Sequence, residues 1–191
     1  WLKQKGVDLA LGVMINPGSQ PTVKEMVRLG MGPHLAYKMT FGVPAPGHAA
    51  VFAEAMGELG DGYVCAGSFR PMDDLATPGI KFCSDLQDKY RTGKRITHIM
   101  YEAGVLEGMI QVEALRLAMQ KVAFEKLTPG DVLKHGFYRI KDLPTGDISS
   151  TPLTYGKGDI EGVDQIRIDQ VQKGKSVKVG IFPVRHIYTK K

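Results

Sequence analysis

The sequence has few cysteines and lacks a long apolar run. Its 191 residues include only Cys65 and Cys83, which allow one disulfide bond at most. A bridge is conceivable in an extracytoplasmic protein, but two buried, unpaired thiols are the preferred prediction. The apolar stretches last only a few residues, whereas a membrane-spanning helix needs about 20. The composition therefore excludes a disulfide scaffold and a transmembrane protein.

Sequence signatures of common enzyme classes are also missing. There is no G-x-S-x-G elbow, Walker loop, G-x-G-x-x-G fingerprint or H-E-x-x-H motif. The five histidines do not fall at metal-ligand spacing with one another or with a cysteine. A nucleophile such as Ser19 or Ser68 would need a histidine or acidic partner, and the pattern offers none. We therefore expect no enzyme activity, no metal and no cofactor.

Charge and hydrophobicity are those of an ordinary globular chain. Hydrophobic residues make up 43% and charged residues 24%, and 25 Lys+Arg against 20 Asp+Glu give a net charge of +5. The basic residues cluster tightly only in residues 89–95, 173–178 and 190–191. Such clusters are more often solvated faces than nucleic-acid sites, so we expect no nucleic-acid partner.

The first half alternates between strand and helix patterns. Short apolar segments that predict buried strands cover residues 7–14, 34–40 and 63–69. Each is followed by a loop rich in proline or glycine and then by a predicted helix, over residues 21–29, 48–59 and 78–90. Three such units in series predict an α/β fold with a doubly wound parallel sheet.

The second half changes character. Apolar residues with a period near 3.6 predict a long amphipathic helix over residues 96–122. Another helix is predicted to begin after Thr128, since Thr-Pro-Gly with Asp131 is a typical helix start. Residues 163–172 and 176–188 alternate around Lys173-Gly174-Lys175, which predicts a C-terminal β-hairpin.

The candidate binding residues lie in loops after the predicted strands, because open α/β sheets bind ligands outside the carboxyl ends of their strands. They combine hydroxyls, an amide, a fixed positive charge and aromatic walls, which suit a small organic solute. They are Asn16, Ser19, Thr40, Phe41, Ser68, Phe69 and Arg70. Each also has an ordinary structural role open to it, as a turn, a helix cap, a core aromatic or a solvated charge.

Several segments, in their order and spacing, carry a resemblance to a known family. They are Leu2 to Met14 with Asn16-Pro17, Arg28-Leu29-Gly30-Met31, Glu58 to Val64 leading to Ala66-Gly67-Ser68-Phe69, Tyr90-Arg91, Tyr101-Glu102-Ala103-Gly104, and Leu153-Thr154-Tyr155 before Gly158 to Gly162. Together they resemble the branched-chain amino-acid binding protein family, the type I periplasmic substrate-binding proteins of ABC transporters. The resemblance covers nearly the whole chain.

The resemblance implies two doubly wound lobes that close like a hinge on a solute in the cleft between them. In that scheme residues 1–94 form part of the second lobe, residues 95–152 are helices returning to the first lobe, and residues 153–191 are a crossover and hairpin rejoining the second. The first-lobe sheet has no counterpart here, and the first residues read like the end of a helix. We therefore expect the C-terminal portion of such a protein, with at most half of the binding site, which pairs with a missing N-terminal lobe or self-associates.

The function implied is that of an extracytoplasmic solute receptor of an ABC importer, periplasmic or anchored as a lipoprotein, made with a signal peptide and partnered by a membrane permease. The alternative is a ligand-sensing domain of a regulator or receptor with the same fold. Amino-acid-binding members place an acidic side chain where this sequence has Thr40-Phe41. Without a partner for an ammonium group, an amino acid is disfavoured, and a carboxylate, an amide or an aromatic acid is favoured.

Overall fold

The computed structural model describes residues 1–13, 18–44, 49–70, 72, 74–91, 93, 95–96 and 99–184. The chain forms two compact units. The first contains Trp1–Gly67 and Ile166–Phe182, and the second contains Ser68–Gln165 with the residues from Pro183 on. Within the described ranges, none of the helices combines the length and apolar character needed to cross a membrane.

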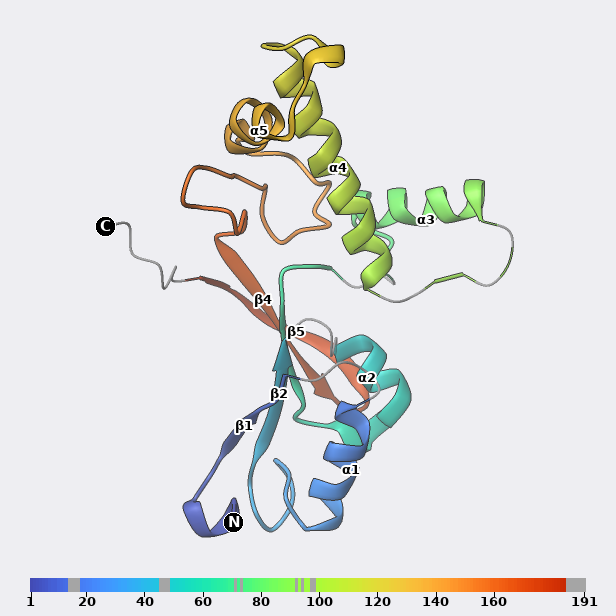
Figure 1. The fold of residues 1–191 in the computed structure, drawn as a ribbon. Helices are drawn as coiled ribbons and strands as arrows, with labels where there is room; N and C mark the ends of the chain where they lie inside the picture. The colour runs from blue at the N-terminus through green and yellow to red at the C-terminus, as the bar shows by residue number, and fades with distance from the viewer. Residues whose placement is uncertain are drawn as a thin grey trace. The chain divides into compact units, whose positions relative to one another are not determined.

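A five-stranded sheet runs in the order β1 to β5 (Figure 1). Its strands are β1 (Leu9–Leu11), β2 (Thr40–Pro44), β3 (Val64–Gly67), β4 (Gln165–Gln172) and β5 (Lys175–Pro183). The first three strands are parallel, and β4 pairs with β3 in the antiparallel direction. The predicted α/β class, the parallel core and the C-terminal hairpin are confirmed.

Two helices of the first unit, α1 (Ser19–Arg28) and α2 (Ala49–Met56), pack on one face of this sheet. The core between them consists of alternate residues of the strands and the apolar side of each helix. Phe52 of α2 stacks on Tyr63, with the ring centroids 3.7 Å apart and the planes at 8°. Short 3-10 turns, η1 (Lys3–Lys5) and η3 (Gly57–Gly60), complete the unit.

The hairpin turn between β4 and β5 follows directly from its sequence. Lys173 and Gly174 both have positive φ, 52° and 69°, as the tight two-residue turn of a twisted hairpin requires. The Asp61 carboxylate accepts hydrogen bonds from both of their backbone N–H groups at 2.9 Å. This contact ties the hairpin to the loop before β3.

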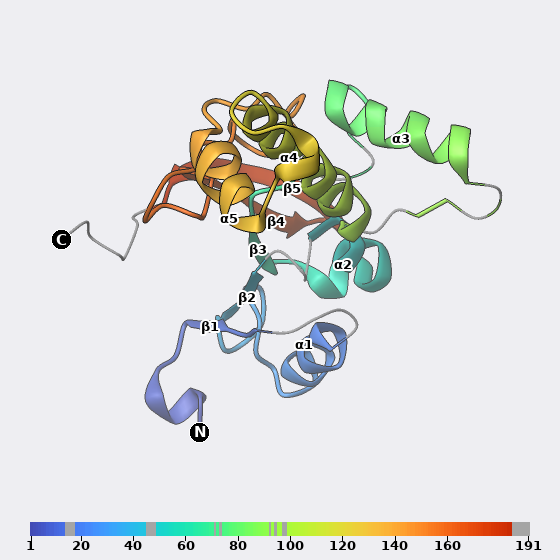
Figure 2. The ribbon, with the colours of Figure 1, turned by 45° about the horizontal axis from the view of Figure 1, so that its top comes forward.

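Helices dominate the second unit. They are α3 (Pro78–Tyr90), α4 (Met100–Met119) and α5 (Pro129–Asp131), with the short turns η4 (Phe124–Lys126), η5 (Val132–Gly136) and η6 (Phe137–Arg139). Thr128 caps α5 as predicted: its hydroxyl accepts from the backbone N–H of Asp131 at 3.2 Å, while its own N–H donates to the Asp131 carboxylate at 3.1 Å. In Figure 2, α4 lies beside α5. Residues of α3, α4 and η5 contribute to one apolar core.

The predicted bounds of the second strand and of the long helix need correction. The second strand is not residues 34–40 but Thr40–Pro44. Leu35, Tyr37 and Met39 alternate as in a strand, yet this segment closes on itself, because Gly32 donates to Tyr37 O and Tyr37 donates to Gly30 O. The long helix is shorter than residues 96–122 and spans Met100–Met119.

The chain passes from the first unit to the second after Gly67. Helix α3 lies in the second unit and packs against α4. Ile80 and Cys83 of α3 share the core of the second unit with Leu106 of α4. This apolar contact, which the sequence of α3 alone does not predict, assigns α3 to the second unit.

We expect Gly136→Ala to destabilise the second unit. A Cβ at Gly136 would overlap the backbone oxygen of Ala114, so η5 could no longer pack closely against α4. Such overpacking costs about 1 to 3 kcal/mol. Urea unfolding followed by circular dichroism measures the loss.

The matched control is Gly108→Ala, in the middle of α4, where a Cβ meets nothing within 4 Å. This change should stabilise the protein by about 0.5 to 1 kcal/mol, because alanine favours a helix over glycine. Equal effects of the two substitutions would contradict the packing described.

Candidate functional site

The carboxyl ends of the three parallel strands define the edge where a ligand is expected. β1 ends at Leu11, β2 at Pro44 and β3 at Gly67, and the parallel register brings these ends to one edge of the sheet. The predicted site residue Asn16 lies outside the described residues, and so does the segment after β2, residues 45–48.

Thr40 and Phe41 are at the other end of their strand. They begin β2 instead of following it: Thr40 pairs with Leu9, and its backbone N–H donates to Asp8 O at 2.8 Å. Phe41 is 7% exposed and packs in the core, with its ring 6.0 Å from that of Tyr63. The assignment of both residues to a loop after the strand is therefore wrong, because the strand begins where it was expected to end.

Ser19 starts α1 and is fully buried. Its side chain forms a hydrogen bond with Tyr63. Burial raises the pKa of the Tyr63 hydroxyl well above its ordinary value, and the Ser19 hydrogen bond offsets part of that rise. Ser19 thus satisfies a polar atom inside the core.

Ser68, Phe69 and Arg70 follow β3 and pair with residues 148–150 of the second unit. Ser68 O accepts from the backbone N–H of Ser150 at 2.8 Å, and the Arg70 N–H donates to Ile148 O at 3.0 Å. Phe69 packs partly buried against the core of the second unit. This pairing holds the segment in an extended conformation with all three side chains partly exposed.

Arg70 has an acidic neighbour. Its guanidinium lies 3.8 Å from the Asp74 carboxylate, and the two side chains are 23% and 33% exposed. At that distance and exposure the attraction is weak, so Arg70 keeps most of its capacity to bind an anion.

Two charged residues of β4, Arg167 and Asp169, lie within a strand and were not predicted as candidate site residues. The Arg167 Nε donates to both Asp169 carboxylate oxygens at 2.8 and 2.9 Å. Their side chains are 10% and 4% exposed, so this is a buried ion pair. The sequence gives no signal for this burial, because the alternation with Ile166 and Ile168 predicts that Arg167 and Asp169 face solvent.

Cys65 and Cys83 are both buried and free, as preferred from the sequence. Cys65 lies in the core of the first unit and Cys83 in that of the second. Burial raises the pKa of the Cys65 thiol to about 12, a hydrogen bond from Ala49 opposes the rise, and the negative charge of Asp169 adds to it. Burial likewise raises the pKa of Cys83 to about 11. Both thiols are therefore inert at neutral pH.

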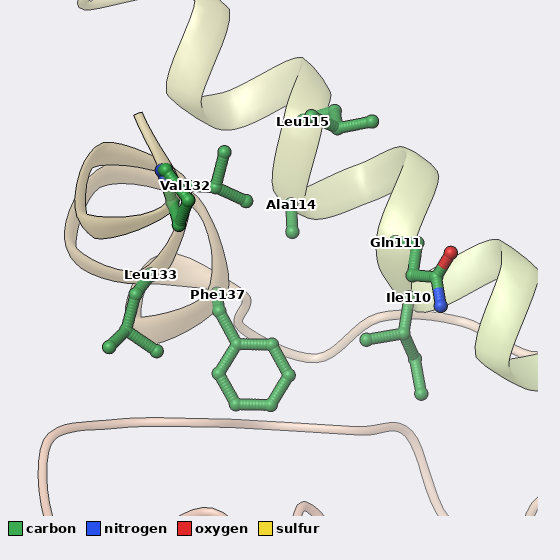
Figure 3. A pocket seen from close by; sticks show the side chains of 8 residues that line it. Ile110, Gln111, Ala114, Leu115, Val132, Leu133 and Phe137 are labelled. Carbon is green, nitrogen blue, oxygen red and sulfur yellow. The ribbon is translucent and has the colours of Figure 1, made fainter. Parts of the chain in front are cut away.

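The second unit contains an apolar groove of ≈ 450 Å³ between α4 and the α5–η6 segment (Figure 3). Its lining is aliphatic and aromatic apart from Gln111. On the same helix, Val112 and Met119 are 67% and 50% exposed. The groove lacks the polar groups that would orient a polar solute. In the part of the chain that the structure describes, no three His, Cys, Asp or Glu side chains gather as metal ligands would.

Comparisons with known proteins bear on this geometry. No family model matches the sequence, and no curated protein matches it. Solved structures do match. A branched-chain amino-acid ABC transporter protein from Thermus thermophilus with bound valine superposes with a TM-score of 0.76 and 21% identity, over 96% of this chain and 48% of that one. The chain has the fold of one half of a type I periplasmic binding protein.

Two further matches show the same half-fold. The fatty acid ABC transporter substrate-binding protein from Thermomonospora curvata has a TM-score of 0.67 and 18% identity, over 96% of this chain and 45% of its own. A solute-binding protein from R. palustris in complex with benzoate has a TM-score of 0.61 and 14% identity, over 94% and 44%. The chain therefore spans about half the length of the structures that it matches.

The buried Cys65 thiol generates a pH prediction. Its ordinary pKa is 9.0 and its folded pKa is about 12, so unfolding releases a proton between these two pH values and stability falls as the pH rises through them. In that window each pH unit costs about 1.4 kcal/mol. Urea unfolding at pH 8, 9 and 10 should show a steeper decline for the wild type than for Cys65→Ala. Parallel declines would show that Cys65 is accessible when folded.

Proposed function

We propose that this protein is an extracytoplasmic solute-binding receptor of an ABC importer and that it binds a small organic acid. The match over 96% of the chain to a valine-bound transporter protein carries the proposal. Two other matched proteins are described with fatty acid and with benzoate. Valine, fatty acids and benzoate differ in their apolar parts, but each has a carboxylate. A carboxylate is therefore the group that we expect the solute to present.

Within this class, the proposal favours an acid without an ammonium group. The segment that follows β2 is residues 45–48, whose sequence is Ala-Pro-Gly-His. Like Thr40-Phe41, it contains no acidic residue that could pair with an ammonium group. An amino acid would then bury its positive charge without a partner from this segment, which is costly. An aromatic or aliphatic acid avoids that cost.

The candidate contacts from this chain are Asn16 and the segment Ser68 to Arg70. Ser68 offers a hydroxyl, Phe69 an apolar wall and Arg70 a positive charge, and all three side chains keep some exposure. Ser19 is fully buried and Thr40 and Phe41 lie at the amino end of β2, so the proposal leaves them out. A membrane permease would be the partner that receives the solute.

A thermal-shift experiment tests the proposal. The protein is heated with benzoate, octanoate or valine, and in parallel with the primary amide of each. A solute at 100 times its dissociation constant adds about 2.7 kcal/mol to stability, which raises the melting temperature by several degrees. We expect benzoate or octanoate to give such a shift and valine to give less.

The amides serve as matched controls, since they keep the shape of each acid and lack the negative charge of its carboxylate. A shift with none of the three acids would contradict a receptor for small organic acids. A shift with valine alone would keep the receptor and overturn the choice of an acid without an ammonium group.

A further inference from the structure

Arg167 and Asp169 form a buried charge pair in the first unit. Besides the two Nε hydrogen bonds, the Arg167 Nη2 lies 2.7 Å from Asp169 Oδ1. Asp169 thus binds the side edge of the guanidinium, which is formed by Nε and Nη2. These contacts fix the plane of a side chain that is otherwise long and flexible.

A buried ion pair of this kind contributes little net free energy to folding. Arg167, Asp169 and Val171 occupy alternate positions of β4 and face the same side of the sheet, where only Val171 is apolar. Burying two charges removes their hydration, and apolar replacements at such positions are often neutral or stabilising. A strand that places charges at inward positions therefore points to a role beyond packing.

The place of Arg167 in the sheet is the edge where ligands bind. It pairs with Gly67, the last residue of β3, while Asp169 pairs with Cys65. Arg167 therefore lies at the carboxyl ends of the parallel strands.

The guanidinium still has donors to offer. It carries five N–H groups, and the contacts with Asp169 use those of Nε and one of Nη2. The end edge, formed by Nη1 and the second N–H of Nη2, makes no hydrogen bond with the residues that the structure describes. Two parallel N–H groups on one edge match the two oxygens of a carboxylate.

We propose that the end edge of Arg167 binds the carboxylate of the solute and that Asp169 positions the guanidinium for it, an inference that rests on the proposed receptor function. Arg167 is then a specificity-determining residue that separates acids from their amides. Asp169 acts through Arg167 and does not touch the solute.

Isothermal titration calorimetry with benzoate and benzamide, and with octanoate and octanamide, tests this role. The variants are Arg167→Lys and the double variant Arg167→Gln/Asp169→Asn, which removes both charges so that neither stays buried alone. We expect the double variant to bind the acid about 10- to 100-fold more weakly, as the loss of a charge-assisted pair implies, and to bind the amide as before. Arg167→Lys should fall in between, because lysine keeps the charge and loses the planar edge.

The matched control is Arg28→Gln/Glu25→Gln, which removes an exposed Arg–Glu ion pair from the same unit. It should leave both affinities unchanged. An unaltered ratio of acid to amide affinity in the double variant would overturn the role of Arg167 while the receptor function stands. If circular dichroism shows the double variant unfolded, an unaltered ratio in Arg167→Lys overturns it equally.

A wild-type protein that binds none of the acids would instead overturn the receptor function, and the role of Arg167 with it. If the ion pair were merely structural, its removal would weaken the binding of acids and of amides by similar factors. The ratio between the two therefore separates recognition of the carboxylate from general support of the fold.

Discussion

Antiparallel pairing of β4 with β3 is the interaction on which the first unit depends. It joins Ile166–Phe182 to a unit whose other residues end at Gly67, so a loop of about 100 residues closes when the pair forms. The pairing places Val171, which is fully buried, in the core beneath α1 and α2. It also brings the hairpin turn to Asp61. Without it, the three short parallel strands would lose one side of their sheet.

The same pairing explains which parts of the fold were predictable. Local chemistry sufficed for α3, where Thr-Pro-Gly and the apolar spacing predict residues 78–90 and the helix spans Pro78–Tyr90. It also sufficed for the hairpin, because Lys173-Gly174 favours a tight turn between alternating strands. It failed for β2, since Leu35, Tyr37 and Met39 alternate like a strand while the backbone of Gly30 and Gly32 folds the segment back on itself. Tertiary pairing with β1 on one side and β3 on the other selects Thr40–Pro44.

Recognition of the candidate site from sequence was limited for a related reason. Ser68 and Arg70 were predictable as residues after a strand, because the bounds of that strand were predicted nearly correctly. Thr40 and Phe41 were misplaced through the error in β2, and the sequence does not reveal that the Ser19 side chain hydrogen-bonds to Tyr63. Arg167 was not predicted as a site residue because it lies within a strand, where a charged side chain is normally expected to face solvent. That it faces inward becomes visible only from its register opposite Gly67.

Arg70 and Arg167 differ in their exposure to water. This difference affects the free energy with which each could bind a carboxylate. Arg70 is 23% exposed and contacts Asp74 at one distance of 3.8 Å, so an anion that binds it must displace water and order a flexible side chain. Arg167 has already lost its water and its rotational freedom to the fold, because Asp169 holds one edge of it at 2.7 to 2.9 Å. For a carboxylate that binds the other edge, the main free-energy cost is its own desolvation. In the proposed receptor, the stability lost by burying a charged pair in β4 would be offset by a guanidinium that is preorganised for the carboxylate of the solute.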